Sequence, residues 1–167
     1  MTNALLALKK LKKQNNSSVE NIKTIIEVKM LPNIAIEVST KLALKKHWNK
    51  LNPQQKLIFQ QYISQSLVKD YGAILGSYDA LENINITVHA DVKHYDNKAI
   101  VKLIISFNED DEPIIISLKM VQTTRWQIYD LVFSGVSIIK NYQAQFNSHI
   151  KRKGINSLIA KIIKKLG

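Results

Sequence analysis

The chain has 167 residues, which suffices for one domain with a sizeable core and falls short of two independent domains. It contains no cysteine, so disulfides and thiolate metal sites are excluded, and it contains no run of about 18 apolar residues that could span a membrane. The formal net charge is +11, but only two of the 24 basic residues are arginine, and no pattern of arginine forks or aromatics interleaved with cations points to nucleic-acid binding.

The first half of the chain carries the signals of three helices. Ser17-Ser18-Val19-Glu20 predicts a capping box, and the helix that it opens has one apolar side before Pro32 interrupts it, formed by Val19, Ile22, Ile25 and Ile26. A second helix is predicted to end near Lys46 and to bury Ile34, Ala35, Val38 and Leu42. Asn52 followed by Pro53 predicts an N-cap with proline at the first helical position, opening a helix of about six turns.

Beyond residue 84 the apolar period changes from that of a helix to that of a strand. Apolar and polar residues alternate over 84–92, which predicts a half-buried strand with one wet face. A second strand is predicted over 99–107, followed by a turn at 108–113 and strands over 114–121 and 125–133. The short connections predict four consecutive strands in an antiparallel meander.

The C-terminal part is predicted to be helical again. Ser134-Gly135-Val136-Ser137 turns the chain into a helix that ends at Lys153, where Gly154 suits the left-handed conformation past a helix end, and Asn156 is expected to cap the last helix. The chain is therefore predicted to be a single domain over residues 1–167, helical over 1–78, with a sheet over 84–133 and C-terminal helices over 137–166. This order predicts an α+β fold in which helices cover one face of a four-stranded antiparallel meander sheet.

Two blocks of sequence carry a family resemblance. One lies between residues 125 and 161 and reads W-x-x-Y-D, x-G-V-S, N-Y-x-x-Q-F and G-I-x-x-L-I-A-K. The other places Leu31-Pro32 before His47-Trp48 and the helix start Asn52-Pro53-Gln54-Gln55. In these blocks, and in the apolar pattern between them, nearly the whole chain resembles the MlaC (toluene-tolerance) family of periplasmic phospholipid-binding proteins. The resemblance implies an apolar cavity between the sheet and the helices.

The resemblance also implies a function. It predicts a non-enzymatic carrier that shuttles glycerophospholipids through the periplasm and so maintains outer-membrane lipid asymmetry. Its partners would be an outer-membrane lipoprotein complex and an inner-membrane ABC transporter complex with its lipid-binding subunit, with no nucleic acid, and it would act as a monomer. Family members are exported, whereas residues 1–10 lack the order of a signal peptide, so we expect a mature form with an added start methionine.

The candidate lipid contacts are apolar positions on the predicted strands and helices. By period alone they are core residues, because every core shows this pattern. The resemblance implies acyl chains held between sheet and helices, which makes lipid-contact candidates of Leu67, Tyr71, Leu75, Ile86, Val88, Val101, Leu103, Ile116, Leu118, Met120, Ile128, Val132, Ile139, Tyr142 and Phe146. A lipid phosphate at the pocket mouth could be attracted by Lys69, Lys140 or Tyr142.

The polar residues form no catalytic constellation. The four histidines have no serine or carboxylate at a catalytic spacing, and His89, Asp91, His94 and Asp96 are interpreted as the wet face and end of a strand rather than a metal site. Asp130 interrupts an apolar strand and needs a partner, so we expect it to cap the backbone around Gly135. No catalytic residue, metal or cofactor is expected, and the bound phospholipid would be cargo.

Two other functions stay open from the sequence. A small-molecule enzyme on a similar α+β scaffold would need convergent titratable groups facing the cavity, where mostly isoleucine, leucine and valine are expected. A basic membrane-surface adaptor would use the lysines near both ends of the chain, and its binding would be lost at high salt.

Overall fold

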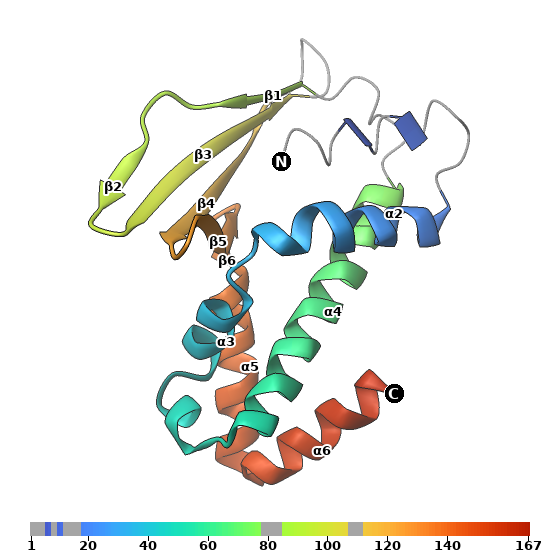
Figure 1. Ribbon diagram of the computed structural model, residues 1–167, viewed down its shortest axis with the longest axis vertical. Coiled ribbons are helices and arrows are strands. Elements are labelled where there is room, and N and C mark those ends of the chain that lie inside the picture. The colour runs from blue at the N-terminus through green and yellow to red at the C-terminus, as the bar shows by residue number, and fades with distance from the viewer. Residues whose placement is uncertain (1–5, 8–9, 12–17, 78–84, 107–111) are drawn as a thin grey trace.

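The computed structural model describes residues 6–7, 10–11, 18–77, 85–106 and 112–167. Figure 1 shows the sheet at one end of the molecule and α3, α4, α5 and α6 at the other. The helical first part contains, in chain order, α2 (Val19–Ile25), the π-helix η1 (Ile26–Met30), the 3-10 helix η2 (Leu31–Asn33), α3 (Ile36–Leu44), the 3-10 helix η3 (Lys45–Lys50) and α4 (Pro53–Ser77). The strands follow: β1 (Asn85–Val88), β2 (Lys93–Tyr95), β3 (Lys98–Ser106), β4 (Ile114–Gln122), β5 (Trp126–Phe133) and β6 (Val136–Ser137). The last two helices are α5 (Ile138–Lys153) and α6 (Ile155–Leu166). The α+β class is confirmed.

The described residues form a sheet of six strands, so the prediction of four was wrong. Its order is β1-β3-β4-β5-β6, all antiparallel, and β2 also pairs with β3. The first predicted strand, over 84–92, is shorter in the structure: β1 ends at Val88, and β2 lies at 93–95, outside every predicted strand. His89 still donates its backbone N–H to Lys102 O at 2.9 Å, and its Nδ1 accepts a hydrogen bond from the Asp91 backbone N–H at 3.1 Å, where the chain leaves the ladder. Such local side-chain bonds compete with strand pairing. The sixth strand, β6, lies in the segment that was predicted to be a turn into the last helices.

A β-bulge separates the two halves of β5. Lys119 pairs with Asp130, but the next residue, Met120, pairs with Ile128, which leaves Tyr129 as an extra residue on β5. A bulge of this kind shifts the alternation of side chains along the bulged strand. Strict alternation of side chains between the two faces therefore cannot be continued from one side of Tyr129 to the other.

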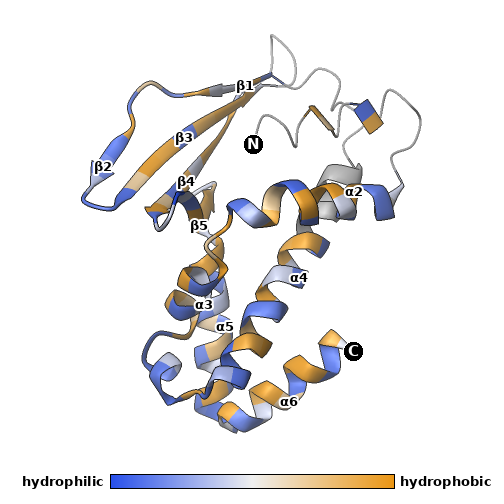
Figure 2. Ribbon diagram, viewed as in Figure 1, coloured by the Kyte–Doolittle hydropathy of each residue, from blue (hydrophilic) through white to orange (hydrophobic). Residues whose placement is uncertain are grey.

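The largest core lies among the helices. Phe59 on α4 meets Phe146 on α5 edge to face, with ring centroids 5.3 Å apart, and Ile162 of α6 is buried in the same cluster. Figure 2 shows the alternating apolar and polar positions of α6 and the apolar length of β3 beside the polar β2.

The buried side of α3 differs from the prediction. Leu42 is 39% exposed, whereas the hydroxyl residues Ser39 and Thr40 are buried. Their hydroxyls donate to the backbone carbonyl oxygens of Ala35 and Ile36, at 3.0 and 2.7 Å, so neither is left unsatisfied inside. The burial of Ala35 agrees with the prediction.

Helix ends confirm some cap predictions and correct others. Asn52 and Gln55 cap α4 reciprocally, since each side-chain oxygen accepts the other residue's backbone N–H. The cap of α2 is Ser18, not Ser17, and it accepts from the Asn21 N–H at 3.3 Å. Asn156 lies inside α6, which begins at Ile155 without a side-chain cap.

The described helices meet the sheet at the end formed by β5 and β6 rather than over a whole face. α3, η2 and α5 contact β5, and α5 also contacts β6. Ala35 N–H donates to Ile128 O at 2.8 Å, and the Ser39 hydroxyl donates to Tyr129 O at 2.8 Å, so α3 is tied to the outer edge of β5.

Gly154 joins α5 to α6 with a backbone that other residues rarely adopt. Its φ of 80° and ψ of 164° lie in the extended positive-φ region, not the left-handed helical region that the sequence suggested. Gly154→Ala should lower the free energy of unfolding by about 1 to 3 kcal/mol, and entirely through backbone strain, because an added Cβ meets nothing within 4 Å.

Urea unfolding measures this difference, and Gly167→Ala is the matched control. Gly167 stands at the end of the chain without a positive φ, so its substitution should change the unfolding free energy by less than about 0.5 kcal/mol. Equal effects of the two substitutions would contradict the strain at Gly154.

Candidate apolar binding site

One face of the sheet is a continuous apolar surface. Residues directly opposite one another in an antiparallel ladder project to the same face, so the register assigns faces without reference to side-chain positions. Val88 pairs with Leu103, which pairs with Ile116, so these three side chains share a face. The other cross-strand pairs on this face add Ile86, Ala99, Val101, Ile105, Ile114, Leu118, Met120, Ile128 and Leu131. We call this set the apolar face. It contains eight of the nine strand residues that the sequence singled out.

Val132 is the exception. It pairs with Ser117 and Ser137, which places it on the opposite face, whereas its neighbour Leu131 pairs with Leu118 on the apolar face. Strict alternation from Ile128 predicts that Val132 projects to the apolar face, and this prediction is wrong because the bulge at Tyr129 shifts the alternation by one residue. A bulge has no apolar signature, so the sequence offered no signal for Leu131.

The apolar face is only partly covered. Leu103 and Leu118 are buried, and Val101, Ile116 and Met120 are half-buried. Val88 at the sheet edge is 62% exposed. Among the described strands, the covered part of the face therefore lies along its centre, and its edge opens to solvent.

A cavity of about 60 Å³ lies where the sheet meets the helices. Three of the predicted contacts line it: Leu67 of α4, Ile128 of β5 and Ile139 of α5. The remaining lining residues, which the sequence analysis did not select, are Lys29, Met30, Asn33, Ile34, Ser39, Tyr129, Asp130, Leu131 and Ile138. The cavity thus joins η1, η2, α3, α4, β5 and α5 at one point.

The other helical candidates lie elsewhere. Tyr142 and Phe146 are buried in the helical core, where Tyr142 meets Tyr62 with centroids 6.3 Å apart, so Tyr142 does not stand at a solvent-facing pocket mouth. The side chains of Tyr71 and Leu75 fall outside the described residues. Lys69 and Lys140 are exposed.

The cavity is small for a lipid. Its volume of about 60 Å³ is well below the roughly 300 to 1,000 Å³ of small-ligand sites. Two acyl chains would require the walls around Leu67, Ile128 and Ile139 to separate.

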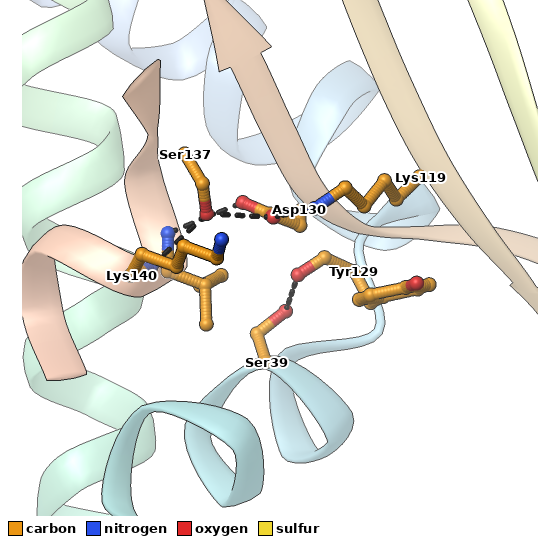
Figure 3. Close-up of polar contacts among 7 residues, drawn as sticks. Ser39, Lys119, Tyr129, Asp130, Ser137 and Lys140 are labelled. Atoms are coloured by element: carbon orange, nitrogen blue, oxygen red, sulfur yellow. Dashed lines mark hydrogen bonds and ion pairs between the residues drawn. The ribbon is translucent and has the colours of Figure 1, made fainter. Parts of the chain in front are cut away.

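A buried carboxylate holds the wall of this cavity in place (Figure 3). Asp130 accepts hydrogen bonds from Lys119 Nζ at 3.0 Å, from the Ser137 hydroxyl at 2.7 Å and from the Ile139 backbone N–H at 3.2 Å. The Ser137 oxygen in turn accepts from the Lys140 N–H at 3.0 Å, which makes Ser137 the N-cap of α5.

Asp130 is therefore a structural cap, as expected, but at a different place. It binds the first turn of α5 and not the backbone of the turn at Gly135. Negative charge is favourable at a helix N-terminus, and the paired lysine offsets the cost of burying the carboxylate.

The histidine and aspartate cluster on the hairpin is open to solvent. His89, Asp91, His94 and Asp96 are all exposed, and the described residues contain no group of three or more metal-binding side chains. His94 packs its ring against Trp126, with centroids 6.2 Å apart.

Removing the Asp130 carboxylate should destabilise the protein strongly. Asp130→Ala leaves Lys119 without its ion-pair partner and the Ile139 N–H in the first turn of α5 without its acceptor, so we expect a loss of about 3 kcal/mol in the free energy of unfolding. Urea titration of the variant measures it. Asp91→Ala, at an exposed position, is the control and should change it by less than about 0.5 kcal/mol. A loss below 1 kcal/mol for Asp130→Ala would contradict the tethering role.

None of the helices in the described ranges is long and apolar enough to cross a membrane.

Comparison with known proteins agrees with this architecture. Over 98% of its length the chain superposes, with a TM-score of 0.82, on 90% of a phospholipid-binding protein from Ralstonia solanacearum that was solved in complex with a phospholipid; sequence identity is 19%, so the match shows the fold. The chain is 22% identical over 145 residues to the intermembrane phospholipid transport system binding protein MlaC of Haemophilus influenzae, a match that spans 84% of this chain and 66% of that protein. The family model for the MlaC protein matches residues 1–164. The chain belongs to the MlaC family.

Proposed function

We propose that this protein binds a phospholipid by its acyl chains along the apolar face and carries it between membranes through the periplasm. The observation that supports this most directly is the continuity of the apolar face with the cavity: Ile128 and Leu131 belong to both. The similar Ralstonia solanacearum protein was solved with a phospholipid, and the Haemophilus influenzae relative is named as part of a phospholipid transport system.

The hydrophobic effect explains why such cargo needs a protein wall. Burying one methylene is worth about 0.8 kcal/mol, so two acyl chains of some thirty methylenes together represent more than ~20 kcal/mol. An empty cavity of roughly 1,000 Å³ would cost about as much, which exceeds the whole stability margin of a typical domain.

The attachments of the sheet support a route by which room for the lipid is made. α3 and α5 are tied to β5 by the bonds of Ser39 to Tyr129 O and of Ile139 N–H to Asp130. The described helices make their main contacts with the sheet at β5 and β6. Acyl chains would enter beside this attached edge, along β3 and β4, while the bonds at β5 stay closed.

The partners would be an outer-membrane lipoprotein complex and an inner-membrane ABC transporter complex with its lipid-binding subunit, in a system that maintains outer-membrane lipid asymmetry. Transfer requires a partner to change the affinity of this chain for lipid, because a site that binds equally well in both states moves no cargo.

The cavity offers little to an enzyme. Lys29 and Asp130 are the titratable side chains among its lining residues, apart from the Tyr129 phenol, and both Asp130 oxygens already accept hydrogen bonds. The walls favour apolar binding over proton transfer.

Native mass spectrometry of the purified chain, followed by organic extraction and lipid mass spectrometry, tests the proposal. We expect one phospholipid per chain, with loose selection of acyl length because acyl chains offer no hydrogen bonds. A folded sample that carries no lipid, and takes none up from vesicles, would overturn it.

Two neighbouring substitutions locate the site. Val88→Glu places a carboxylate on the exposed edge of the apolar face, and Thr87→Glu places the same charge one residue away on the opposite face. Because burying an unpaired charge against acyl chains is costly, Val88→Glu should retain at least tenfold less lipid, whereas Thr87→Glu should retain the wild-type amount. Equal retention by both variants would place the lipid away from the apolar face.

A further inference from the structure

The excess positive charge of this protein is confined to part of the chain. Residues 40–69 and 131–167 hold 13 of the 24 basic residues and none of the 13 acidic residues. These ranges include all of α5 and α6 and most of α4. Figure 1 shows α6 at the end of the molecule away from the sheet, so the lysines of α6 lie far from the apolar face.

A pocket of about 420 Å³ lies within this basic region, between α4, α5 and α6. Arg152, Lys161 and Lys165 line it together with His149, and no carboxylate is among its lining residues. Its apolar part is formed by Tyr62, Phe146, Leu158 and Ile162. The volume lies within the range of small-ligand sites, roughly 300 to 1,000 Å³.

The cations of the pocket have little to bind within the chain. Arg152 Nε donates to Ser148 O at 3.3 Å, which leaves the four N–H donors of its two terminal nitrogens available. Lys165 Nζ lies over the Tyr62 ring, 5.6 Å from its centroid. In the part of the chain that the structure describes, the ion pairs are Lys23 with Glu20 and Lys119 with Asp130, and neither is in this pocket.

The pKa of His149 is sensitive to the positive charges around the pocket. Desolvation and the charges of Lys161, Lys153 and Arg152 lower the pKa of its imidazole below the ordinary value. Its Nε2 lies 3.2 Å from Ser157 Oγ. The same positive potential that disfavours the imidazolium favours an anion.

We propose that the pocket between α4, α5 and α6 binds a phosphate ester. A guanidinium fork and two ammonium groups match the charge of a phosphate, and the fork can donate to two of its oxygens at once. The pocket is larger than a phosphate alone, and its apolar part has room for the glycerol or other organic group that the ester carries. The ester would come either from a lipid head group at a membrane surface or from a soluble metabolite.

Titration of the full chain with sn-glycerol 3-phosphate, followed by NMR of the histidine imidazoles and by calorimetry, tests this proposal. Binding should raise the pKa of His149, because the anion offsets the charges of Lys161, Lys153 and Arg152 that lower it, and neutral glycerol at equal ionic strength should not. The double variant Arg152→Gln/Lys161→Gln should lose at least tenfold in affinity.

The matched control is Lys151→Gln/Lys164→Gln, which removes the same two charges from exposed positions of α5 and α6 outside the pocket. It should bind glycerol phosphate within twofold of the wild type. Equal weakening of the two double variants would overturn the proposal, because it would assign binding to diffuse surface charge. No response of His149 at millimolar ligand would overturn it as well.

Vesicles distinguish the two sources of the ester. Cosedimentation with phosphatidylglycerol in phosphatidylcholine that fails for Arg152→Gln/Lys161→Gln and persists for the control identifies the lipid head group. Cosedimentation that is equal in both variants, with glycerol phosphate binding still specific to the pocket, identifies a soluble ester. Cargo extraction is independent of this test, because Arg152→Gln/Lys161→Gln leaves the apolar face unchanged.

Discussion

The Asp130 carboxylate is the interaction on which the arrangement of sheet and helices depends. A carboxylate on a strand is costly to bury unless each oxygen finds donors, and here they come from β4, β6 and α5. These bonds set where β6 pairs and where α5 begins. They also hold Ile139 against β5, so the cavity wall and the buried charge form one unit.

The sequence predicts which residues share an apolar face or stripe, but not which other residues they contact. Strand alternation selected the apolar face almost completely, and the bulge at Tyr129 alone misplaced Val132. Helix periodicity identifies an apolar stripe without saying which neighbour the stripe meets. Ile139 and Phe146, two turns apart on the same stripe, both belong to the helical core, but of the two only Ile139 also lines the cavity beside β5.

The fold was predictable wherever one local signal decides a boundary. Asn52 opens α4, and Gly154 ends α5. The failures occur where a polar group finds a partner that an apolar pattern does not encode. His89 Nδ1 accepts the Asp91 N–H just after β1 ends, four residues before the predicted strand end, and the buried Ser39 hydroxyl donates to a carbonyl of β5. In both places a hydrogen bond outweighs the propensity of the segment.

The split of the outer strand bears on how the protein behaves at high concentration. A long, flat, apolar edge strand is a template on which other chains add, and proteins avoid this with short or interrupted edges. Here the outer edge of β3 is covered by two short pieces, β1 with four residues and β2 with three, separated by the break at residues 89–92. Neither piece is long enough to seed fibrillar stacking. The protein can therefore keep part of its apolar face accessible without exposing an edge that leads to aggregation.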